Sequence, residues 1–299
     1  MLRTLAAILF GFLPVFYAAP VCQILALSGG GSFGAVEVGI LDALTHQKRI
    51  PPTFDLITGV SAGGLNAAVL SYHDTTMAAL PLMVNMYTNL RTAHVYYTDL
   101  LHLQTAWSIF NNSPLEATLR FLFKSLPVPK APPQTLIGAS NLYTDELDIF
   151  TFHELAFEDQ MDVLMSTTAI PVVFPPRKYN GTLYIDGGLI SNEIITEAMS
   201  YRDCSFYNVT FISARAEYHA ITPTTFLSYL KTVIDMLLHT FDSELARGSH
   251  SCPHPKGEIH ACYPTDDALA NYSVLDFDHG QALYESGKKH HVCMAYPLC

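Results

Sequence analysis

The chain has little charge, and most of what it has is negative. Only 14% of its 299 residues are charged, and 27 acidic residues against 16 Lys and Arg give a formal net charge of −11. Nucleic-acid binding depends on clustered Lys and Arg that neutralise phosphates, so this composition argues against a nucleic-acid partner. The same charge gives no general attraction to anionic membranes. Any contact with lipid must therefore rest on local apolar surface.

Internal repeats and low-complexity linkers are absent as well. The chain is 49% hydrophobic, enough to bury a large core, and nothing divides it, which predicts one α/β domain. Strand-like runs alternate with helical patterns, and this alternation favours a mostly parallel sheet covered by helices. The expected strands are 23–28, 54–59, 135–140, 183–186 and 207–213. The expected helices are 35–44, a group within 77–123 and, as the clearest, 226–246.

The first twenty residues have the pattern of a secretory signal peptide. One early cation precedes an apolar run from Leu5 to Phe16, and small residues follow it. We expect cleavage, with a mature chain that starts near Val21 and is secreted or enters the secretory lumen. The cleavage site is imperfect, so an uncleaved membrane anchor is the alternative.

Cysteines and sequons agree with export. An even set of cysteines with four members near the C-terminus predicts disulfides: Cys22, Cys204, Cys252, Cys262, Cys293 and Cys299. Four Asn-x-Ser/Thr triplets are candidate glycosylation sites: Asn111, Asn180, Asn208 and Asn271. Histidines at 250, 254 and 260 accompany two of the cysteines, but their spacing fits no standard zinc pattern, and no metal site is expected.

Two glycine-framed turns near the start carry the clearest chemical signal. Ser28 to Gly34 follows one apolar run, and Gly59 to Gly63 follows the next. Each sits where a strand is expected to turn into a helix, and glycines there allow close approach of the backbone. The second turn places Ser61 on a sharp bend with its hydroxyl exposed, as for a nucleophile. The first turn predicts a backbone oxyanion hole beside it.

A serine nucleophile needs a base, and one candidate follows a later strand. Asp186 ends the expected strand 183–186 and precedes two glycines, which permit a tight turn that leaves the carboxylate accessible. Asp-Gly pairs are also common in hairpins, so this motif alone is weak. The three motifs together are much more specific.

In this order, the three motifs resemble the patatin-like phospholipase family. The segment Ser166 to Pro171 and the residue Asn192 are also similar to the family pattern, and the similarity covers about Gln23 to Met199. The resemblance implies a three-layer α/β/α fold with a mostly parallel sheet. It implies residues 21–200 as the catalytic core and 201–299 as the C-terminal part of the same domain.

The resemblance also implies the chemistry and the site. It implies hydrolysis of lipid acyl esters by a Ser-Asp dyad, with Ser61 as nucleophile and Asp186 as base, without histidine, calcium or cofactor. The implied oxyanion hole is formed by backbone amides: Gly29, Gly30, Gly31 and Ala62. The remaining glycines of the motifs are Gly34, Gly59, Gly63, Gly187 and Gly188. The partner is a lipid or membrane-surface substrate.

Two positions depart from the family pattern. Phe33 stands where the family usually has Arg or Lys, and Glu193 stands where it has Pro. Phe33 removes a cation beside the oxyanion turn. We therefore expect neutral or zwitterionic esters to be better substrates than strongly anionic phospholipids.

Three other interpretations stay open from the sequence. An α/β-hydrolase with a Ser-His-Asp triad could use His279, His290 or His291. Gly29 to Gly34 also matches a dinucleotide-binding fingerprint, although Asp55 stands before rather than after the second strand. Finally, the chain could be a secreted lipid-binding or storage protein that kept the fold without the activity.

Overall fold

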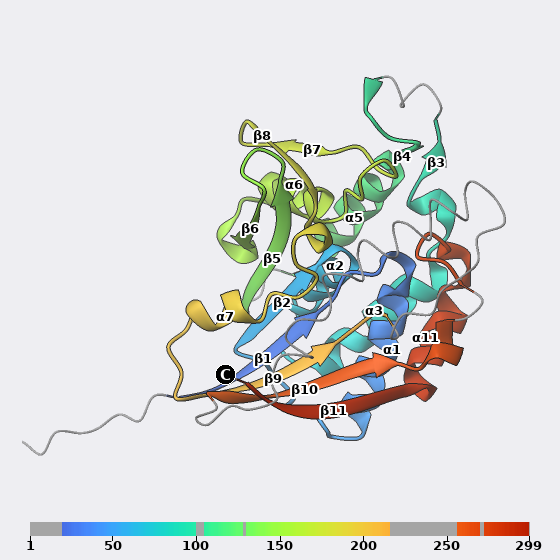
Figure 1. The fold of residues 1–299 in the computed structure, drawn as a ribbon. Coiled ribbons are helices and arrows are strands. Elements are labelled where there is room, and N and C mark those ends of the chain that lie inside the picture. Colours follow the sequence, from blue (N-terminus) through green and yellow to red (C-terminus); the bar gives the residue numbers. More distant parts are fainter. Residues whose placement is uncertain (1–19, 100–104, 128–129, 216–255, 270–271, 299) are drawn as a thin grey trace, which may run out of the picture.

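A computed structural model describes residues 20–99, 105–127, 130–215, 256–269 and 272–298. Its centre is a mixed sheet in the order β11-β10-β9-β1-β2-β5-β8-β7, with β6 paired to β5 (Figure 1). Helices flank this sheet, so the predicted α/β class with a mostly parallel sheet is confirmed.

Parallel strands form the middle of the sheet. Each neighbouring pair among them runs in the same direction: β10 (Gly257–Pro264), β9 (Phe206–Ile212), β1 (Val21–Leu27), β2 (Leu56–Val60) and β5 (Gln134–Asn141). Side chains of β1 are buried on both faces of the sheet, which explains why these strands read as continuous apolar runs.

Antiparallel strands complete the two edges. At one edge β11 (His291–Leu298) pairs with β10, and at the other β8 (Thr182–Asp186) pairs with β5 and with β7 (Arg177–Tyr179). The strand β6 (Glu146–Thr151) is also antiparallel to β5. A separate small ribbon pairs β3 (Tyr97–Thr98) with β4 (Phe110–Asn111). All five expected strands are present, as β1, β2, β5, β8 and β9.

Most described helices pack on one face of the sheet. Successive residues of β1 alternate between two cores, with Leu25 and Leu27 in one and Ile24 and Ala26 in the other. The first core contains residues of five helices: α1 (Gly34–His46), α2 (Ser61–Leu70), α3 (Thr76–Asn89), α5 (Ser113–Ser125) and α6 (Phe157–Thr167). It also contains residues of α11 (Gly280–Lys289), whereas α7 (Thr196–Ser200) packs on the second core (Figure 1). The short α10 (Asp266–Leu269) precedes α11.

The helix predictions have different outcomes. The expected helix 35–44 is confirmed as α1. The stretch 77–123 does contain α3 and α5, but the short strands β3 and β4 interrupt it, so it is not helical throughout. The expected helix 226–246 lies outside the described residues.

Two disulfides join distant parts of the described chain. Cys22 at the start of β1 pairs with Cys204 just before β9, and Cys262 of β10 pairs with Cys293 of β11. Cys252 and Cys299 lie outside the described residues, as does the expected signal peptide up to residue 19. Across the described ranges, no helix combines the length and the apolar character needed to cross a membrane.

Candidate active site

The register of β5 brings two sequence motifs together. On one edge of this strand Gly138 pairs with Val60, the last residue of β2, and the next residue, Ala139, pairs with Asp186. The strands β2 and β8 thus pair with the same edge of β5, one after the other. Ser61 directly follows Val60, so the candidate nucleophile and the candidate base emerge at adjacent positions of the same edge.

Ser61 occupies the turn from β2 into α2. It is the first residue of α2, has a φ of 52° and is 5% exposed. A non-glycine residue in this left-handed region is unusual and is typical of a nucleophile on a sharp strand-to-helix turn. The turn needs its flanking glycines, because a Cβ at Gly63 would lie 2.4 Å from the Leu27 carbonyl oxygen.

Thr167 at the end of α6 stabilises this turn through hydrogen bonds. The Ser61 amide donates to Thr167 Oγ1 over 2.8 Å, and the Thr167 hydroxyl donates to the Gly138 carbonyl over 2.6 Å. All three groups are buried. One threonine therefore ties the Ser61 turn to the strand that also aligns Asp186.

We expect Thr167→Val to lower both stability and activity. Valine has nearly the same shape but removes the acceptor of the buried Ser61 amide, which costs about 1–3 kcal/mol of unfolding free energy. The loss is measured by urea unfolding. Thr167→Ser keeps both hydrogen bonds and is the matched control. Equal stability of the valine and serine variants would contradict this role for Thr167.

Asp186 is fully buried at the end of β8. Its Oδ1 accepts from the Gly188 amide over 2.9 Å, and its Oδ2 accepts no hydrogen bond from the described residues. Burial raises the pKa of Asp186 to about 6, although the Ser61 hydroxyl, the Gly188 amide and the Arg215 charge oppose this rise. A carboxylate with a raised pKa and a free oxygen beside a serine is equipped to take a proton.

The glycine turn after β1 contacts the segment that follows Asp186. The Gly29 amide donates to Asn192 Oδ1 over 2.8 Å, and Asn192 Nδ2 donates back to the Gly29 carbonyl over 3.3 Å. The amides of Gly30, Gly31 and Ala62 donate to no acceptor within the described parts of the chain. Gly31 and Ala62 begin helical turns, whose first amides have no intrahelical acceptor.

An apolar cavity opens beside Ser61. It has a volume of about 60 Å³ and lies between the site and the helices α3 and α5. Besides Ser61, Gly31 and Ala62, its lining is mainly aliphatic and aromatic: Leu65, Met86, Leu90, Leu115, Leu119, Leu122, Ile170, Phe174 and Phe277. A hydrocarbon chain is the kind of group that such a lining binds.

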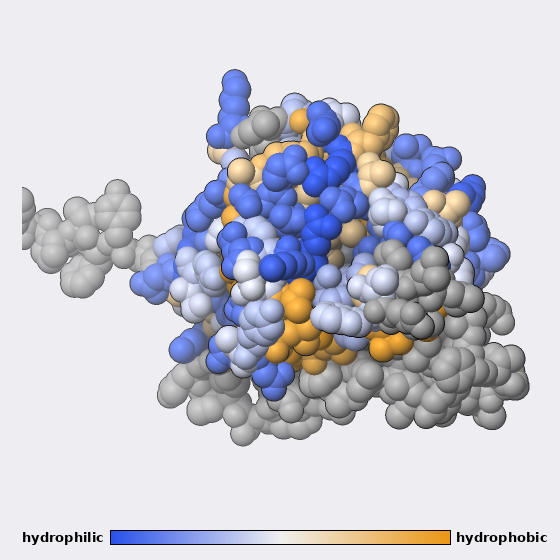
Figure 2. Space-filling model, turned by 90° about the horizontal axis from the view of Figure 1, so that it is seen from above, coloured by the Kyte–Doolittle hydropathy of each residue, from blue (hydrophilic) through white to orange (hydrophobic). Residues whose placement is uncertain are grey.

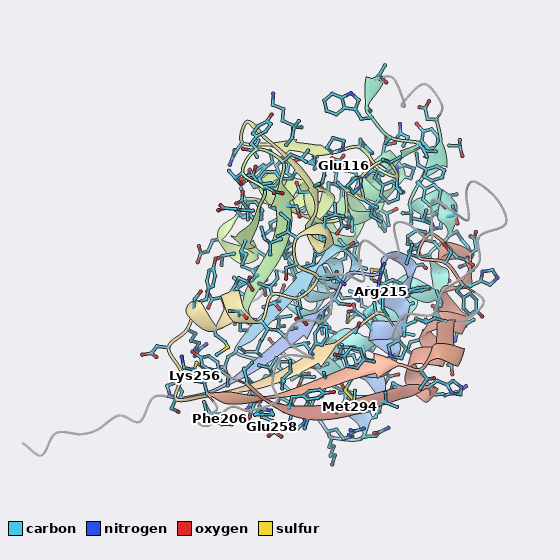
Figure 3. The ribbon with its side chains drawn as sticks, viewed as in Figure 1. Glu116, Phe206, Arg215, Lys256, Glu258 and Met294 are labelled. Carbon is cyan, nitrogen blue, oxygen red and sulfur yellow. A yellow bond between two sulfur atoms is a disulfide. The ribbon has the colours of Figure 1, made fainter. Side chains whose placement is uncertain are left out.

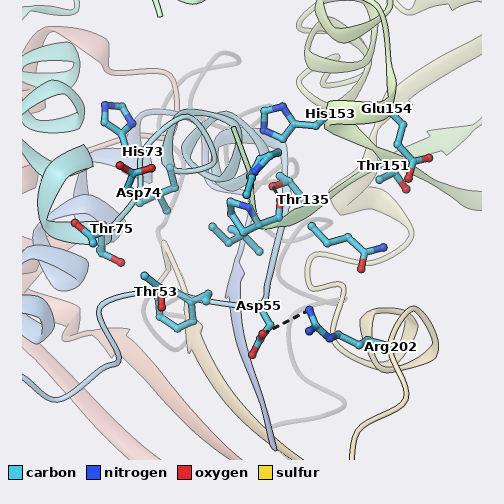
Figure 4. Close-up of a pocket in the computed structure, with 18 residues that line it drawn as sticks. Thr53, Asp55, His73, Asp74, Thr75, Thr135, Thr151, His153, Glu154 and Arg202 are labelled. Atoms are coloured by element: carbon cyan, nitrogen blue, oxygen red, sulfur yellow. Dashed lines mark hydrogen bonds and ion pairs between the residues drawn. The ribbon is translucent and has the colours of Figure 1, made fainter. Parts of the chain in front are cut away.

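A larger cavity of about 620 Å³ lies elsewhere (Figure 4). Asp55 and Gln134 line it, and these residues stand at the amino ends of β2 and β5. Asp55 pairs there with Arg202 at 3.5 Å. Active sites of open α/β sheets lie at the carboxyl ends of the strands, so the smaller cavity at Ser61 is the candidate active site.

The two residues that depart from the family pattern are both buried. Phe33 packs in the main core, and Glu193 is 5% exposed. The cation that lowers the pKa of Asp186 is instead Arg215, which follows β9 and is also buried (Figure 3). The segment before it contacts the glycine turn, since a Cβ at Gly30 would lie 2.5 Å from the Ala214 Cβ.

Residues of the alternative interpretations make other contacts in the structure. His279 contacts Asp276 at 2.8 Å, and His291 contacts the Gly287 carbonyl at 2.9 Å. Asp55 accepts from the Gln23 amide at the opposite end of the sheet from the glycine turn. Among the described side chains, no group of three or more His, Cys, Asp or Glu is arranged to hold a metal ion.

The candidate glycosylation sites differ in accessibility. Asn180 is exposed in the turn between β7 and β8, whereas Asn111 and Asn208 are half-buried within strands. Asn271 lies outside the described residues. Modification at these positions stays a prediction, and Asn180 is the most accessible of the three.

The roles of two residues of the site were not predicted from the sequence. Thr167 lies in the segment Ser166 to Pro171 that resembles the family pattern, but its role depends on contacts with residues 106 and 29 positions away. Arg215 did carry a signal, because it follows a predicted parallel strand, and ligands of such sheets bind beyond the carboxyl ends.

Comparison with known proteins shows which sequences this chain is similar to. Residues 25–199 match the family model described as patatin-like phospholipase. A probable lipid hydrolase of Invertebrate iridescent virus 6 is 27% identical, over 65% of this chain and 67% of the viral protein. A cGAMP-activated phospholipase of Pseudomonas aeruginosa is 28% identical over 58% of this chain and 54% of its own.

A plant protein and a solved structure extend the comparison. Patatin group M-3 of Solanum tuberosum is 26% identical, over 56% of this chain and 49% of its own. The match thus spans only about half of the bacterial and potato proteins. The crystal structure of VipD from Legionella pneumophila aligns with 93% of this chain and 68% of VipD, with 15% identity and a TM-score of 0.41.

Proposed function

Because the chain belongs to the patatin-like phospholipase family, we propose that it hydrolyses fatty-acyl esters of phospholipids or neutral glycerolipids with Ser61 and Asp186. The observation that carries this proposal is the register of β5, which aligns the end of β2 with Asp186. The buried carboxylate with its raised pKa supports the role of Asp186 as general base.

The reaction begins with proton transfer from Ser61 to Asp186. As the serine oxygen attacks the ester carbonyl, the carboxylate takes the hydroxyl proton and later gives it to the departing alcohol oxygen. This leaves an acyl group on Ser61. Asp186 then takes a proton from water, the water oxygen attacks the acyl carbonyl, and the proton returns to Ser61 as the fatty acid leaves.

Backbone amides stabilise the negative charge on the carbonyl oxygen. Gly29 was among the expected donors, but its amide already donates to Asn192, so we assign this role to Gly30, Gly31 and Ala62. Ala62 also contributes the dipole of the α2 N-terminus. Loss of one such donor typically lowers the rate about 10²- to 10³-fold.

The acyl chain occupies the apolar cavity beside Ser61, and the head group stays outside. Phe33 supplies no charge at the glycine turn, and the chain has a net charge of −11. Neutral and zwitterionic esters are therefore the preferred substrates. Faster hydrolysis of anionic vesicles than of phosphatidylcholine vesicles would contradict this preference.

We expect activity to increase as pH rises through about 6, because only the ionised carboxylate accepts the serine proton and the pKa of Asp186 is raised to about 6. Below this pH the rate falls about tenfold per unit, and above about pH 7 it is constant. The measurement is the initial rate on a soluble short-chain ester between pH 4 and 9 (roughly the range where one carboxyl titrates). A rate that rises with its midpoint at the ordinary aspartate pKa would contradict the assignment of a buried carboxylate as the base.

Export through the secretory pathway is part of the proposal. The N-terminal apolar segment is its signal, and the disulfides Cys22–Cys204 and Cys262–Cys293 fit an oxidising compartment. Detection of the protein in the culture medium, with the N-terminus of the mature chain determined by sequencing, tests this directly.

Fatty-acid release tests the function. The protein is incubated with mixed phosphatidylcholine and triacylglycerol dispersions in excess chelator, beside Ser61→Ala and Asp186→Asn variants. Release that both substitutions abolish supports a calcium-independent Ser-Asp hydrolase. A folded protein that binds these lipids without releasing fatty acid would instead be a lipid-binding member of the fold.

A further inference from the structure

Three exposed apolar side chains lie on one folded unit near the candidate active site. Tyr97, Trp107 and Val172 are 47%, 64% and 48% exposed. The segment that begins at Trp107 runs between the other two, because Ser108 bridges to Val172 on one side and β4 pairs with β3 on the other. We call these three side chains the docking surface.

The inner side of this unit forms a wall of the cavity at Ser61. Val95, Ile170 and Phe174 line that cavity and are buried, whereas Tyr97 and Val172 on the same two segments are exposed to solvent. The Tyr96 ring packs on Phe174 with 5.7 Å between the ring centres. The docking surface therefore lies on the outer side of the same wall.

The backbone holds two of these side chains in unusual conformations. Trp107 has a φ of 58° and Val172 a φ of 68°. Positive φ is a genuine outlier for bulky and β-branched residues, and such strain costs about 1–3 kcal/mol per residue. Strain of this kind clusters at functional sites, and here it coincides with two neighbouring apolar side chains that are exposed to water.

We propose that Tyr97, Trp107 and Val172 dock on the surface of a zwitterionic or neutral lipid aggregate and bring its esters to the cavity. This rests on the proposed function. Continuity with the cavity wall argues for lipid as the occupant, and Trp and Tyr favour the interface between hydrocarbon and water. The charge of −11 argues against attraction to anionic head groups.

The surrounding surface fits shallow contact rather than deep burial. The end of the molecule that carries β3 and β4 is at the top of Figure 1, and Figure 2 views this end face-on. Hydrophobic patches of limited extent interrupt a largely hydrophilic surface there. A few apolar side chains can enter the interface while the polar surroundings stay hydrated.

The single tryptophan makes the test direct. Trp107 is the one Trp in the sequence, so selectively excited tryptophan fluorescence reports on the docking surface alone. The inactive Ser61→Ala protein is titrated with phosphatidylcholine vesicles, with and without brominated acyl chains. We expect a blue shift of the emission and quenching by the brominated chains, both largely insensitive to salt.

Val172→Asp and Val292→Asp form a matched pair. Val292 on β11 is 49% exposed, and the labelled Met294 shows this strand at the opposite end of the molecule from Glu116 of α5 (Figure 3). Aspartate tolerates positive φ better than valine, so the first substitution adds no backbone strain. We expect about tenfold weaker vesicle binding for Val172→Asp and no change for Val292→Asp.

Activity assays separate this inference from the proposed function. In the otherwise unsubstituted protein, Val172→Asp should slow hydrolysis of vesicles about tenfold and leave that of soluble 4-nitrophenyl butyrate unchanged. No blue shift with vesicles that the protein hydrolyses would overturn the docking surface and leave the function standing. A quenched blue shift without hydrolysis of any ester would support docking and overturn the function.

Discussion

Replacing Asp186 with asparagine is expected to lower kcat about 10³-fold or more while making the folded protein more stable at neutral pH. Catalysis is lost because asparagine cannot accept the serine proton. Stability increases because the carboxylate is fully buried and burial raises its pKa from 3.8 to about 6. A difference of about two pKa units corresponds to about 3 kcal/mol, which sets the upper size of the effect.

The pH dependence of this gain follows from the raised pKa. Above about pH 6 Asp186 is ionised in both the folded and the unfolded chain, and the folded state bears the full cost of a buried charge. Below about pH 4 the group is protonated in both states and the cost disappears. Urea unfolding with the disulfides intact should therefore show a gain for Asp186→Asn at pH 8 that shrinks toward pH 4 (roughly the ordinary aspartate pKa).

Ser61→Ala is the control for this prediction. It removes the nucleophile and should lose activity at least as strongly, but it leaves the buried carboxylate in place and should show no pH-dependent gain. An Asp186→Asn protein that keeps most of its activity would exclude Asp186 as the base. It would reopen the interpretation with a late histidine.

Gly31→Ala should lower kcat about 10²- to 10³-fold, because it displaces two of the proposed oxyanion donors. Gly31 has a φ of 57°, and a Cβ there would lie 2.2 Å from the Val274 carbonyl oxygen, which is backbone and cannot easily move. The turn must shift, and the amides of Gly30 and Gly31 shift with it. Steady-state kinetics on a soluble ester should show the loss in kcat rather than in KM.

Gly181→Ala separates displacement of the turn from backbone strain in general. Gly181 also has positive φ, at 82°, but a Cβ there would meet nothing within 4 Å. The two variants share the conformational penalty of alanine, and only Gly31→Ala adds a clash at the site. Similar losses of kcat in both would mean that the glycine turn has no specific role.

The strands could be predicted where burial produces a continuous apolar run in the sequence. The parallel strands β1, β2, β5 and β9 are mostly buried, so each reads as an apolar run between turns. The parallel strand β10 escaped prediction, because the exposed His260 interrupts its apolar pattern. The edge strand β11 escaped prediction because its exposed and half-buried residues form no clean alternation. The strand β7 could have been found through the turn residues Asn180 and Gly181, which both have positive φ.

In the candidate site, too, local motifs could be predicted and contacts between distant segments could not. Its glycine turns are local motifs, so the sequence indicates Ser61 and its neighbours directly. Their positions relative to Asp186 depend on β5, which pairs with both β2 and β8 but carries no chemical signal itself. That the Gly29 amide is engaged by Asn192 follows from a contact across 163 residues and could not be read from either segment.

The disulfide between Cys22 and Cys204 closes a covalent ring that contains the residues of the candidate active site. Its two cysteines are 182 positions apart, and the ring encloses the glycine turn, Ser61, Thr167 and Asp186. A protease that cuts one peptide bond inside this ring opens it without releasing a fragment. Such a nicked molecule would keep its parts together until a reductant separates them.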